Sequence, residues 1–405
     1  MKISPKRIFE NIIEAILLIS STVTTLTVLL IIIFLFGEGL QLFNKTPLEE
    51  GFEVVVNKNN PVNQIGVQQL KNIFDANITN WKELGGKKDS IIVFRTDDIT
   101  RYYSEAELGA NLELVPQRIG ELIAKTPGII CFISSKYFNN PAISTQGRKL
   151  PLKKITVGSF LSGKEWFPTA QPVAQLGVLP LILGTLWVSL GAILLALPLG
   201  LATAIYMAEI ANDKVRRILK PIIELLAGIP SVVYGFFGLI VVVPLIQKVF
   251  GLPVGETALA GSIILAIMAL PTIITISEDA IRTTPRAMKE ASLALGANKW
   301  QTIHRVVIPY CISGISAAAI LGIGRAIGET MAVLMVTGNA AVIPHTILEP
   351  VRTIPATIAA ELGEAAQGGL HFKALFALGC ILFLITMFIN ILVEIISSRR
   401  KHKAN

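Results

Sequence analysis

Two charged side chains lie one helical turn apart in a stretch that is otherwise apolar. Arg325 and Glu329 are surrounded by glycine, alanine and isoleucine, and Thr330 follows directly. A spacing of four residues on a helix puts both charges on one face, where they can neutralise each other. Ionised groups inside a membrane segment are costly unless they pair or border a water-filled path. The pattern leaves two interpretations open: a salt bridge between subunits, or part of a path for an anion.

The composition indicates that most of the chain lies in lipid. Charged residues make up 16% of its 405 residues and the mean hydropathy is +0.62, whereas soluble domains carry about a quarter charged residues. The net charge of +8 comes from Lys and Arg in particular loops. This distribution indicates the orientation of the chain in a membrane rather than binding to nucleic acid. The cysteines and histidines are scattered. We therefore expect no disulfide framework, no metal site, no enzymatic activity of the chain alone and no nucleic-acid partner.

Six apolar segments are long enough to cross a bilayer as helices. The expected spans are Ile12–Phe36, Val178–Met207, Ile222–Phe250, Ala258–Ser277, Tyr310–Thr337 and Ala374–Ser397. The first is too long for the apolar part of a signal peptide, so we interpret it as a retained anchor. Lys and Arg gather in the loops after the second, fourth and sixth spans. This alternation predicts that both termini lie in the cytoplasm.

Residues 45–170 have the periodicity of a soluble domain. Strands are predicted at Phe52–Val56, Ile91–Phe94 and Ile129–Ile133, and a helix at Val67–Phe74. The orientation of the spans places this insert outside the cell. The predicted fold class is therefore an all-α polytopic membrane protein with six transmembrane helices and a small α/β extracytoplasmic insert.

Four parts follow one another along the chain. They are the cytoplasmic N-terminus with the first span (1–44), the insert (45–170), a five-helix core (171–398) with a cytoplasmic loop (278–309), and a basic cytoplasmic tail (399–405). The segment Gly158–Glu165 approaches the phosphate-binding pattern G-x4-G-K-[ST]. It ends in Glu165, whose carboxylate repels phosphate, so we expect no ATP site and no bound cofactor in this chain.

The loop between the fourth and fifth spans predicts two short helices separated by a turn. Thr284 is the expected N-cap of the first helix, Pro285 its first residue and Gly296 its left-handed end. Asn298 is the expected N-cap of the second helix, which Pro309 closes. One side of the loop is mildly apolar and the other basic. This suits either an ordinary cytoplasmic loop or a docking element for a soluble partner.

The fifth span also carries a stripe of small residues. Its members are Gly314, Ala318, Gly322, Gly324 and Gly328. Small side chains at this spacing let two membrane helices approach closely, so we interpret the stripe as a helix-packing surface.

The spacing of the cytoplasmic loop resembles that of the EAA loop of ABC-importer permeases. The motif reads Glu290-Ala291-Ser292, then Gly296 after three residues, then Val306-x-Ile308-Pro309 after nine more. In that family the loop is a coupling helix that sits in a groove of the ATP-hydrolysing subunit. The resemblance implies an ATPase-coupling role for Glu290, Ala291, Ser292, Gly296, Ile308 and Pro309.

A second resemblance covers about residues 155–397 and the first span. The stretches Phe160–Trp166, Gly322–Val333 and Thr353–Glu361 are similar to phosphate-importer permeases of the PstC type, which have a MetI-like fold. The resemblance implies a heterodimer with a PstA-type sister permease. It also implies two ATPase subunits that use ATP and Mg, an external phosphate-binding protein, inorganic phosphate as substrate, and surrounding membrane lipid.

The resemblance also implies a translocation path that includes Arg325, Glu329 and Thr330. Phosphate near neutral pH keeps a proton on oxygen, so a site with a cation and a carboxylate acceptor suits it. Fully ionised sulfate would be repelled by Glu329. Arg325 would contact the anion, while Glu329 would position Arg325 or accept the phosphate proton.

Parts of the insert look like one lobe of a phosphate-binding protein. The stretches are Asn60–Val62, Ile78–Gly86 and Thr126–Tyr137. The phosphate loop of those receptors corresponds here to Asp98-Ile99-Thr100, which lacks the glycine and adds a negative charge. We expect no tight phosphate binding by this lobe alone. A fixed vestibule, a docking surface for the soluble receptor and an inert insert all remain open.

Two other functions compete with phosphate import. One is a permease for another oxyanion, such as molybdate or sulfate. The other is a membrane sensor that reads phosphate through the insert without transporting it, although the spacing from Glu290 to Pro309 argues for an ATPase partner.

Overall fold

The computed structural model describes residues 5–49, 51–109 and 111–401, and it divides into two compact units. The first comprises Met1–Phe160, Phe167–Leu176 and Ala365–Ala377, and the second Leu161–Trp166, Gly177–Glu364 and Leu378–Asn405. Most of the predicted basic tail, 399–405, lies outside the described residues.

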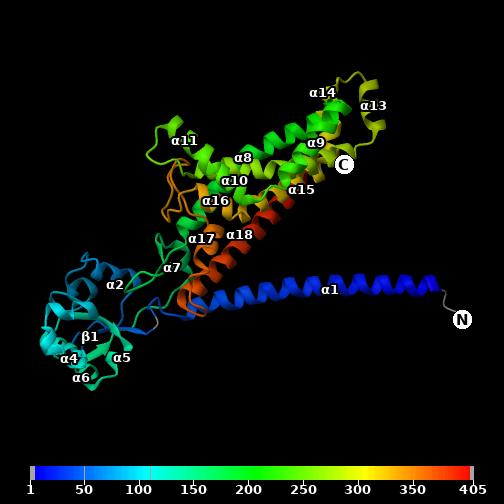
Figure 1. Ribbon diagram of the computed structural model, residues 1–405. Helices are drawn as coiled ribbons and strands as arrows, with labels where there is room; N and C mark the ends of the chain where they lie inside the picture. The colour runs from blue at the N-terminus through cyan, green and yellow to red at the C-terminus, as the bar shows by residue number, and fades with distance from the viewer. Residues whose placement is uncertain (1–4, 50, 110, 402–405) are drawn as a thin grey trace. The chain divides into compact units, whose positions relative to one another are not determined.

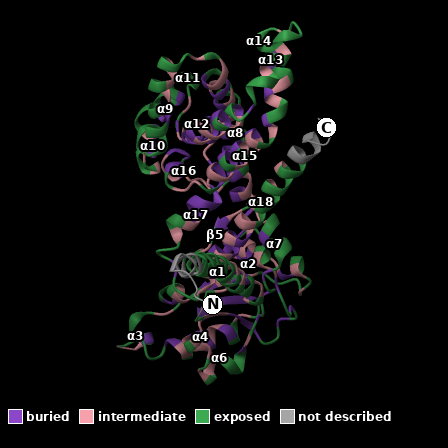
Figure 2. Ribbon diagram, turned by 90° about the vertical axis from the view of Figure 1, so that its right-hand side faces the viewer, coloured by how far each residue is buried: buried purple, intermediate pink, exposed green. Residues whose placement is uncertain are grey.

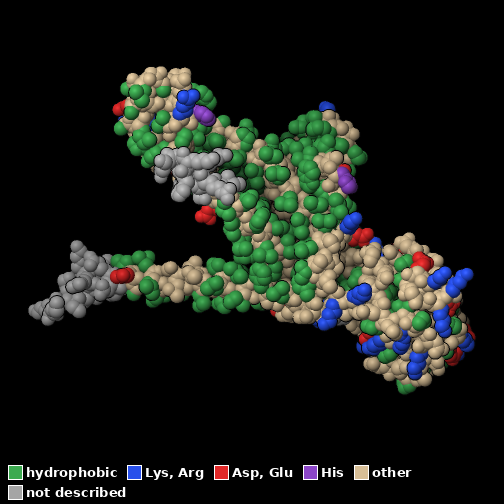
Figure 3. Space-filling view, turned by 180° about the vertical axis from the view of Figure 1, so that it is seen from behind, with side chains coloured by type: hydrophobic (Ala, Val, Ile, Leu, Met, Phe, Trp, Pro, Cys, Tyr) green, Lys and Arg blue, Asp and Glu red, His purple; other side chains and the backbone are tan. Residues whose placement is uncertain are grey.

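Six helices among the described residues are long and apolar enough to cross a membrane. Their ranges are Ile13–Asn44, Leu179–Ile210, Ser231–Phe250, Ala258–Arg282, Lys299–Gly328 and Leu370–Ile395. Apolar side chains cover the sides of the helical unit, whereas Lys and Arg gather on the other unit's water-soluble domain (Figure 3). The predicted six-helix fold class is confirmed.

The second unit is a bundle of helices around α12 (Figure 2). Its helices are α8 (Leu179–Ile205), α9 (Asp213–Ala227), α10 (Ser231–Phe237), α11 (Val243–Phe250), α12 (Ala258–Arg282), α13 (Arg286–Ala294), α14 (Lys299–Thr302), α15 (Ile308–Gly328), α16 (Met331–Val336), α17 (Ile354–Glu361) and most of α18 (Leu370–Lys401). Alanine, glycine and serine on α12 let α8 and α15 approach it closely. Buried residues of these three helices form the centre of the bundle (Figure 2).

Three π turns interrupt the long helices. They are η4 (Tyr206–Ile210) at the end of α8, η5 (Gly238–Val242) between α10 and α11, and η6 (Ile303–Val307) between α14 and α15. Each adds one residue to a helical turn; η5 and η6 continue into α11 and α15, whereas η4 ends the helix before Ala211.

Two predicted spans have different limits in the structure. The third was predicted to begin at Ile222, but this residue belongs to α9, and the span begins at Ser231 after a break at Gly228–Pro230. The fifth was predicted to run to Thr337, but α15 ends at Gly328. Proline and glycine disfavour helix at these two breaks. Both breaks lie within apolar runs, and hydropathy alone cannot locate them because it does not depend on backbone conformation.

The insert is an α/β domain with a mixed sheet. Its strands are β1 (Phe52–Asn57), β2 (Ile92–Arg95), β3 (Ile129–Ser134) and β4 (Gly147–Lys149), in the order β2-β3-β1-β4. Strand β1 is antiparallel to β3 and β4, while β2 is parallel to β3. The three predicted strands and the predicted helix α2 (Val67–Phe74) are confirmed, with ends that differ by one residue at most.

Alternating side chains of the sheet fill two cores. Val54 and Val56 enter one core with Trp81, whereas Val55 enters the other with Phe94. This alternation follows from the two-residue period of a strand. Short helices pack on both faces (Figure 1): α2 covers the core that holds Val54, and the core that holds Val55 is covered by α3 (Glu105–Leu108), α4 (Val115–Lys125), α5 (Ser135–Phe138) and α6 (Pro141–Gln146). The first span, α1 (Pro5–Leu40), belongs to the same unit.

Candidate translocation path and coupling surface

Arg325 is a half-buried cation in a membrane-length helix, with no carboxylate beside it. Its Nη1 donates a long hydrogen bond of 3.5 Å to Thr272 Oγ1 on α12. Among the described residues it forms no ion pair. Because a guanidinium stays charged at physiological pH, its donors are available to an anion.

Glu329 does not share a helical face with Arg325, so the predicted mutual neutralisation is wrong. The backbone turns extended at Glu329, with φ −70° and ψ 135°, and helix resumes only at Met331. Gly324 and Gly328 weaken this end of α15 because glycine disfavours helix. The break separates the two charges, and no ion pair joins them.

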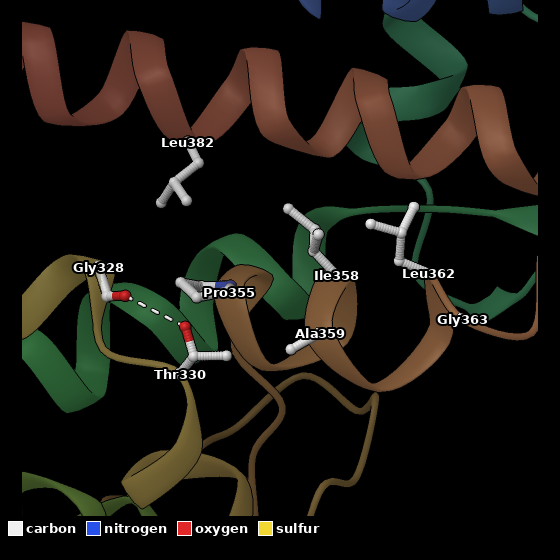
Figure 4. Close-up of a pocket in the computed structure, with 8 residues that line it drawn as sticks. All are labelled: Gly328, Thr330, Pro355, Ile358, Ala359, Leu362, Gly363 and Leu382. Carbon is white, nitrogen blue, oxygen red and sulfur yellow. Dashed lines mark hydrogen bonds between the residues drawn. The ribbon is translucent and has the colours of Figure 1, made fainter. Parts of the chain in front are cut away.

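Thr330 borders an apolar cavity of about 480 Å³. The cavity is lined by Gly328, Thr330, Pro355, Ile358, Ala359, Leu362, Gly363 and Leu382. The Thr330 hydroxyl donates to the Gly328 carbonyl oxygen over 3.3 Å, and Ile358 and Leu382 face the cavity from α17 and α18 (Figure 4). The helix break at Gly328–Thr330 therefore lies at the wall of this cavity.

The small-residue stripe of α15 divides into two parts. A Cβ at Gly314 would lie 2.3 Å from the Cβ of Ala280, and one at Gly322 would lie 2.8 Å from Ile273, so both glycines allow close contact with α12. Ala318 is fully buried between them. A Cβ at Gly324 or Gly328 would meet nothing within 4 Å. These two glycines therefore do not pack against another helix of this chain, and their role in helix packing stays a prediction.

The cytoplasmic loop forms the two predicted helices, but its first cap differs. Pro285, not Thr284, occupies the N-cap of α13, with ψ 135°. The Thr284 hydroxyl is buried 2.9 Å from Cys311 Sγ, so tertiary contact replaces capping. Gly296 takes the predicted left-handed conformation, with φ 87°. Asn298 caps α14 as predicted, accepting a hydrogen bond from the Gln301 N–H.

Pro309 does not close the second helix. It sits in the first turn of α15, directly after the π turn η6, so the chain stays helical from Lys299 to Gly328. The wider π turn accommodates the proline ring, which would otherwise clash with the carbonyl group four residues earlier. The last part of the EAA-type motif, from Lys299 to Pro309, therefore continues without interruption into the fifth span.

The outer surface of the loop is apolar at several points. Helix α13 buries no residue (Figure 2). Leu295 is 89% exposed and Trp300 64% exposed, and Leu293 and Met288 are also exposed. Glu290 and Ala291 lie on the same exposed helix. Large apolar side chains at the tip of a polar loop are typical of a protein interaction site.

A buried ion cluster near the loop was missed by the sequence analysis. The Glu278 side chain is 1% exposed, and it lies 2.8 Å from Arg216 Nε, 3.3 Å from Lys220 Nζ and 3.7 Å from Arg282 Nη1. Burial by itself lowers the pKa of Lys220, but its bond to Asp279 and the charges of Glu278 and Asp279 outweigh burial and raise that pKa. The signal in the sequence was an acidic residue at the end of an apolar span, but its partner Arg216 is 62 residues away.

Two stretches that were similar to PstC-type permeases meet in the structure. Trp166 Nε1 donates to Glu361 Oε2 over 3.0 Å, and Arg352 Nη1 lies 2.8 Å from Glu361 Oε1. Arg352 Nε also donates to the Asn339 carbonyl oxygen over 3.0 Å. Glu361 therefore ties Trp166 to α17, which lines the cavity.

The Asp98 carboxylate of the insert is held by two neighbouring donors. Its Oδ2 accepts from the Arg95 N–H over 3.0 Å, and its Oδ1 lies 3.1 Å from Arg101 Nη1. Both donors are thus occupied by an internal anion. The expectation that the lobe does not bind phosphate tightly stays a prediction.

Taken together, the spans, the unpaired cation beside a helix break and the exposed helix α13 are the features of a polytopic membrane permease. A family model described as "Binding-protein-dependent transport system inner membrane component" matches residues 196–402, and the chain belongs to this family. A second model, "PBP superfamily domain", matches residues 48–180, which include the insert. The predicted resemblances to an importer permease and to a binding-protein lobe are confirmed.

Known proteins resemble the permease part in particular. The probable ABC transporter permease protein YqgH of Bacillus subtilis is 42% identical over 242 residues, which cover 60% of this chain and 78% of the relative. The phosphate transport system permease protein PstC of Mesorhizobium japonicum is 41% identical, with 57% of this chain and 75% of the relative covered. A structure of the inward-facing MetNI methionine ABC transporter aligns with 55% of this chain and 96% of its own, at 19% identity and a TM-score of 0.44.

Proposed function

We propose that this chain is the permease subunit of an ATP-driven phosphate importer. The observation that carries the proposal is Arg325, a cation without an acidic partner that lies next to the helix break at Gly328. Two further facts support it: the family of the chain, and relatives named as phosphate transport permeases.

The proposed complex contains partners of three kinds. A sister permease of the PstA type would complete the path, two ATPase subunits would bind the exposed loop, and an external phosphate-binding protein would deliver the anion. ATP and Mg would be used by the ATPase subunits, and this chain would bind no cofactor. The distribution of Lys and Arg supports cytoplasmic termini and an external insert.

Each site residue has a separate proposed role. Arg325 would hold the phosphate oxygens through charge-assisted hydrogen bonds, which are stronger than neutral ones. Glu329 does not pair with Arg325, so its proposed role narrows to accepting the proton that phosphate carries. Thr330 would expose a hydroxyl to the path, next to the cavity.

The coupling role rests on the cytoplasmic loop. Closure of the ATPase subunits would displace α13 (which we call the coupling helix), and this displacement would change the access of the path. The exposed Leu295 and Trp300 support a protein partner at this loop.

The test is a reconstituted complex of the two permeases and the ATPase in lipid vesicles. We expect phosphate-loaded receptor to raise ATP hydrolysis and to drive phosphate into the vesicles, with molybdate and sulfate failing to compete. In Arg325→Ala, uptake should fall by about tenfold or more while the complex still assembles.

Three results would contradict the proposal. Normal phosphate uptake by Arg325→Ala would remove the assigned path. Competition by sulfate or molybdate would favour a different oxyanion. A chain that binds no ATPase would favour a sensor.

A further inference from the structure

The coupling helix α13 is held to the rest of the core by few polar side chains. In the part of the chain that the structure describes, two side-chain polar contacts anchor it. Lys289 forms an ion pair with Glu209, and Ser292 Oγ lies 3.0 Å from Thr302 Oγ1. Since α13 buries no residue, these contacts are its specific attachments.

Both attachments end at a π turn. Glu209 lies inside η4, which ends the long helix α8, and Thr302 directly precedes η6, which leads into α15. A π turn is often found at functional sites, and it is a point where a helix can bend. The two spans therefore carry a deformable turn where the coupling helix is attached.

The ion pair is the directional contact at the end of α8. Side chains of Glu209 and Lys289 are only 12% and 22% exposed, so water screens them less than a surface pair. Apolar side chains, such as Ile205 and Ile281, join α8 to α12 at this level. Apolar contact has no preferred direction, so it does not fix where α8 moves.

The neighbouring helices are fixed in a different way. Glu278 joins Arg216 and Lys220 of α9 to the end of α12. This cluster holds α9 and α12 together without touching α13. The Lys289–Glu209 pair, by contrast, joins the side chains of α13 to the end of α8.

We propose that the Lys289–Glu209 ion pair is the joint through which movement of the coupling helix reaches the second membrane span. The proposal rests on the proposed function, because it needs an ATPase that moves α13. Both residues are positioning residues, since neither lies at the path that we assign to phosphate. Loss of the pair should leave ATP hydrolysis intact but disconnect it from transport.

The experiment measures phosphate imported per ATP hydrolysed by the assembled complex in vesicles, with phosphate-loaded receptor outside. Glu209→Gln and Lys289→Gln should each lower this ratio by about tenfold. The exchanged pair, Glu209→Lys with Lys289→Glu, should restore it to within about twofold of the wild type. Matched controls are Glu224→Gln and Lys214→Gln on α9, whose side chains are exposed and form no ion pair among the described residues.

The outcomes separate this joint from the function on which it rests. If the wild-type complex does not import phosphate, the proposed function fails. If it does and both single variants keep the wild-type ratio, the joint is excluded. The joint is also excluded if the exchanged pair behaves no better than the single variants.

A second pair of variants keeps the proposal testable if the first variants prevent assembly of the complex. If the single variants do not assemble, Glu209→Asp and Lys289→Arg keep both charges and alter only the length of the contact. We expect these variants to assemble with a ratio several-fold below the wild type. A wild-type ratio in both would overturn the proposal.

Discussion

Glu278 and Arg216 form a buried ion pair between two helices at the same end of the bundle as the coupling helix. The carboxylate Oε1 of Glu278 lies 2.8 Å from Arg216 Nε, and the Glu278 side chain is 1% exposed. A carboxylate in such a place is stable only while cations surround it. The pair therefore fixes α9 against α12 and makes both helices depend on one acidic residue.

The first prediction concerns this residue. Glu278→Gln leaves Arg216, Lys220 and Arg282 close together without their shared anion, so we expect a loss of about 3 kcal/mol in the free energy of unfolding. Thermal unfolding of the purified chain in detergent measures this as a lower Tm. Glu224→Gln, on the exposed side of α9, should change the free energy by less than about 0.5 kcal/mol. Equal Tm values for the two variants would show that the cluster does not stabilise the fold.

The second prediction concerns the hydrogen bond between Trp166 and Glu361 of α17. Trp166→Phe keeps the aromatic ring but removes the Nε1 donor to Glu361. Arg352 still neutralises Glu361, so we expect a stability loss of only about 1 kcal/mol. Because α17 lines the cavity beside Thr330, uptake driven by the receptor should fall several-fold while hydrolysis without receptor stays unchanged. Unchanged uptake in vesicles would show that transport does not depend on the Trp166–Glu361 hydrogen bond.

The third prediction is a pH dependence in the insert. Burial raises the pKa of the Cys131 thiol above its usual 9.0. A raised folded pKa favours the protonated form, so its contribution to stability is complete below about pH 9 and declines as the pH rises further. Maleimide should therefore label Cys131 slowly at pH 8 in the folded chain and rapidly after denaturation. Rapid labelling of the folded chain would contradict the burial of β3.

Local patterns predicted the fold where a residue's own neighbours decide its conformation. The strand at Phe52–Val56 could be predicted because a run of β-branched valines favours an extended backbone. Gly296 and Asn298 could be assigned since a left-handed end and a helix cap are local features.

Other features depended on contacts between distant residues. Thr284 failed as a cap because its hydroxyl turns to Cys311. The end of α15 at Gly328 lies inside an apolar run, where hydropathy gives no stop signal. The Glu278 cluster and the Lys289–Glu209 pair each join residues more than 60 positions apart. No local pattern identifies such partners. The four-part division of the chain, the orientation of its termini and the roles of the site residues stay predictions.

The last prediction concerns phosphate and the insert. Asp98 already accepts the Arg95 N–H and pairs with Arg101, so added phosphate meets occupied donors and a negative charge. We expect calorimetry of the full chain in lipid nanodiscs to detect no micromolar binding by the insert, with Arg325→Ala present in every sample to remove the proposed path site.

Asp98→Gly should free both donors and allow weak binding, with a Kd of about 1 mM, since a few neutral N–H groups and one exposed arginine hold an anion only loosely. Asp75→Gly, an exposed acidic residue in the same domain, serves as the control and should bind no better than the parent. Micromolar binding by the parent would mean that the lobe is a working receptor, and its role would then be delivery of phosphate rather than docking.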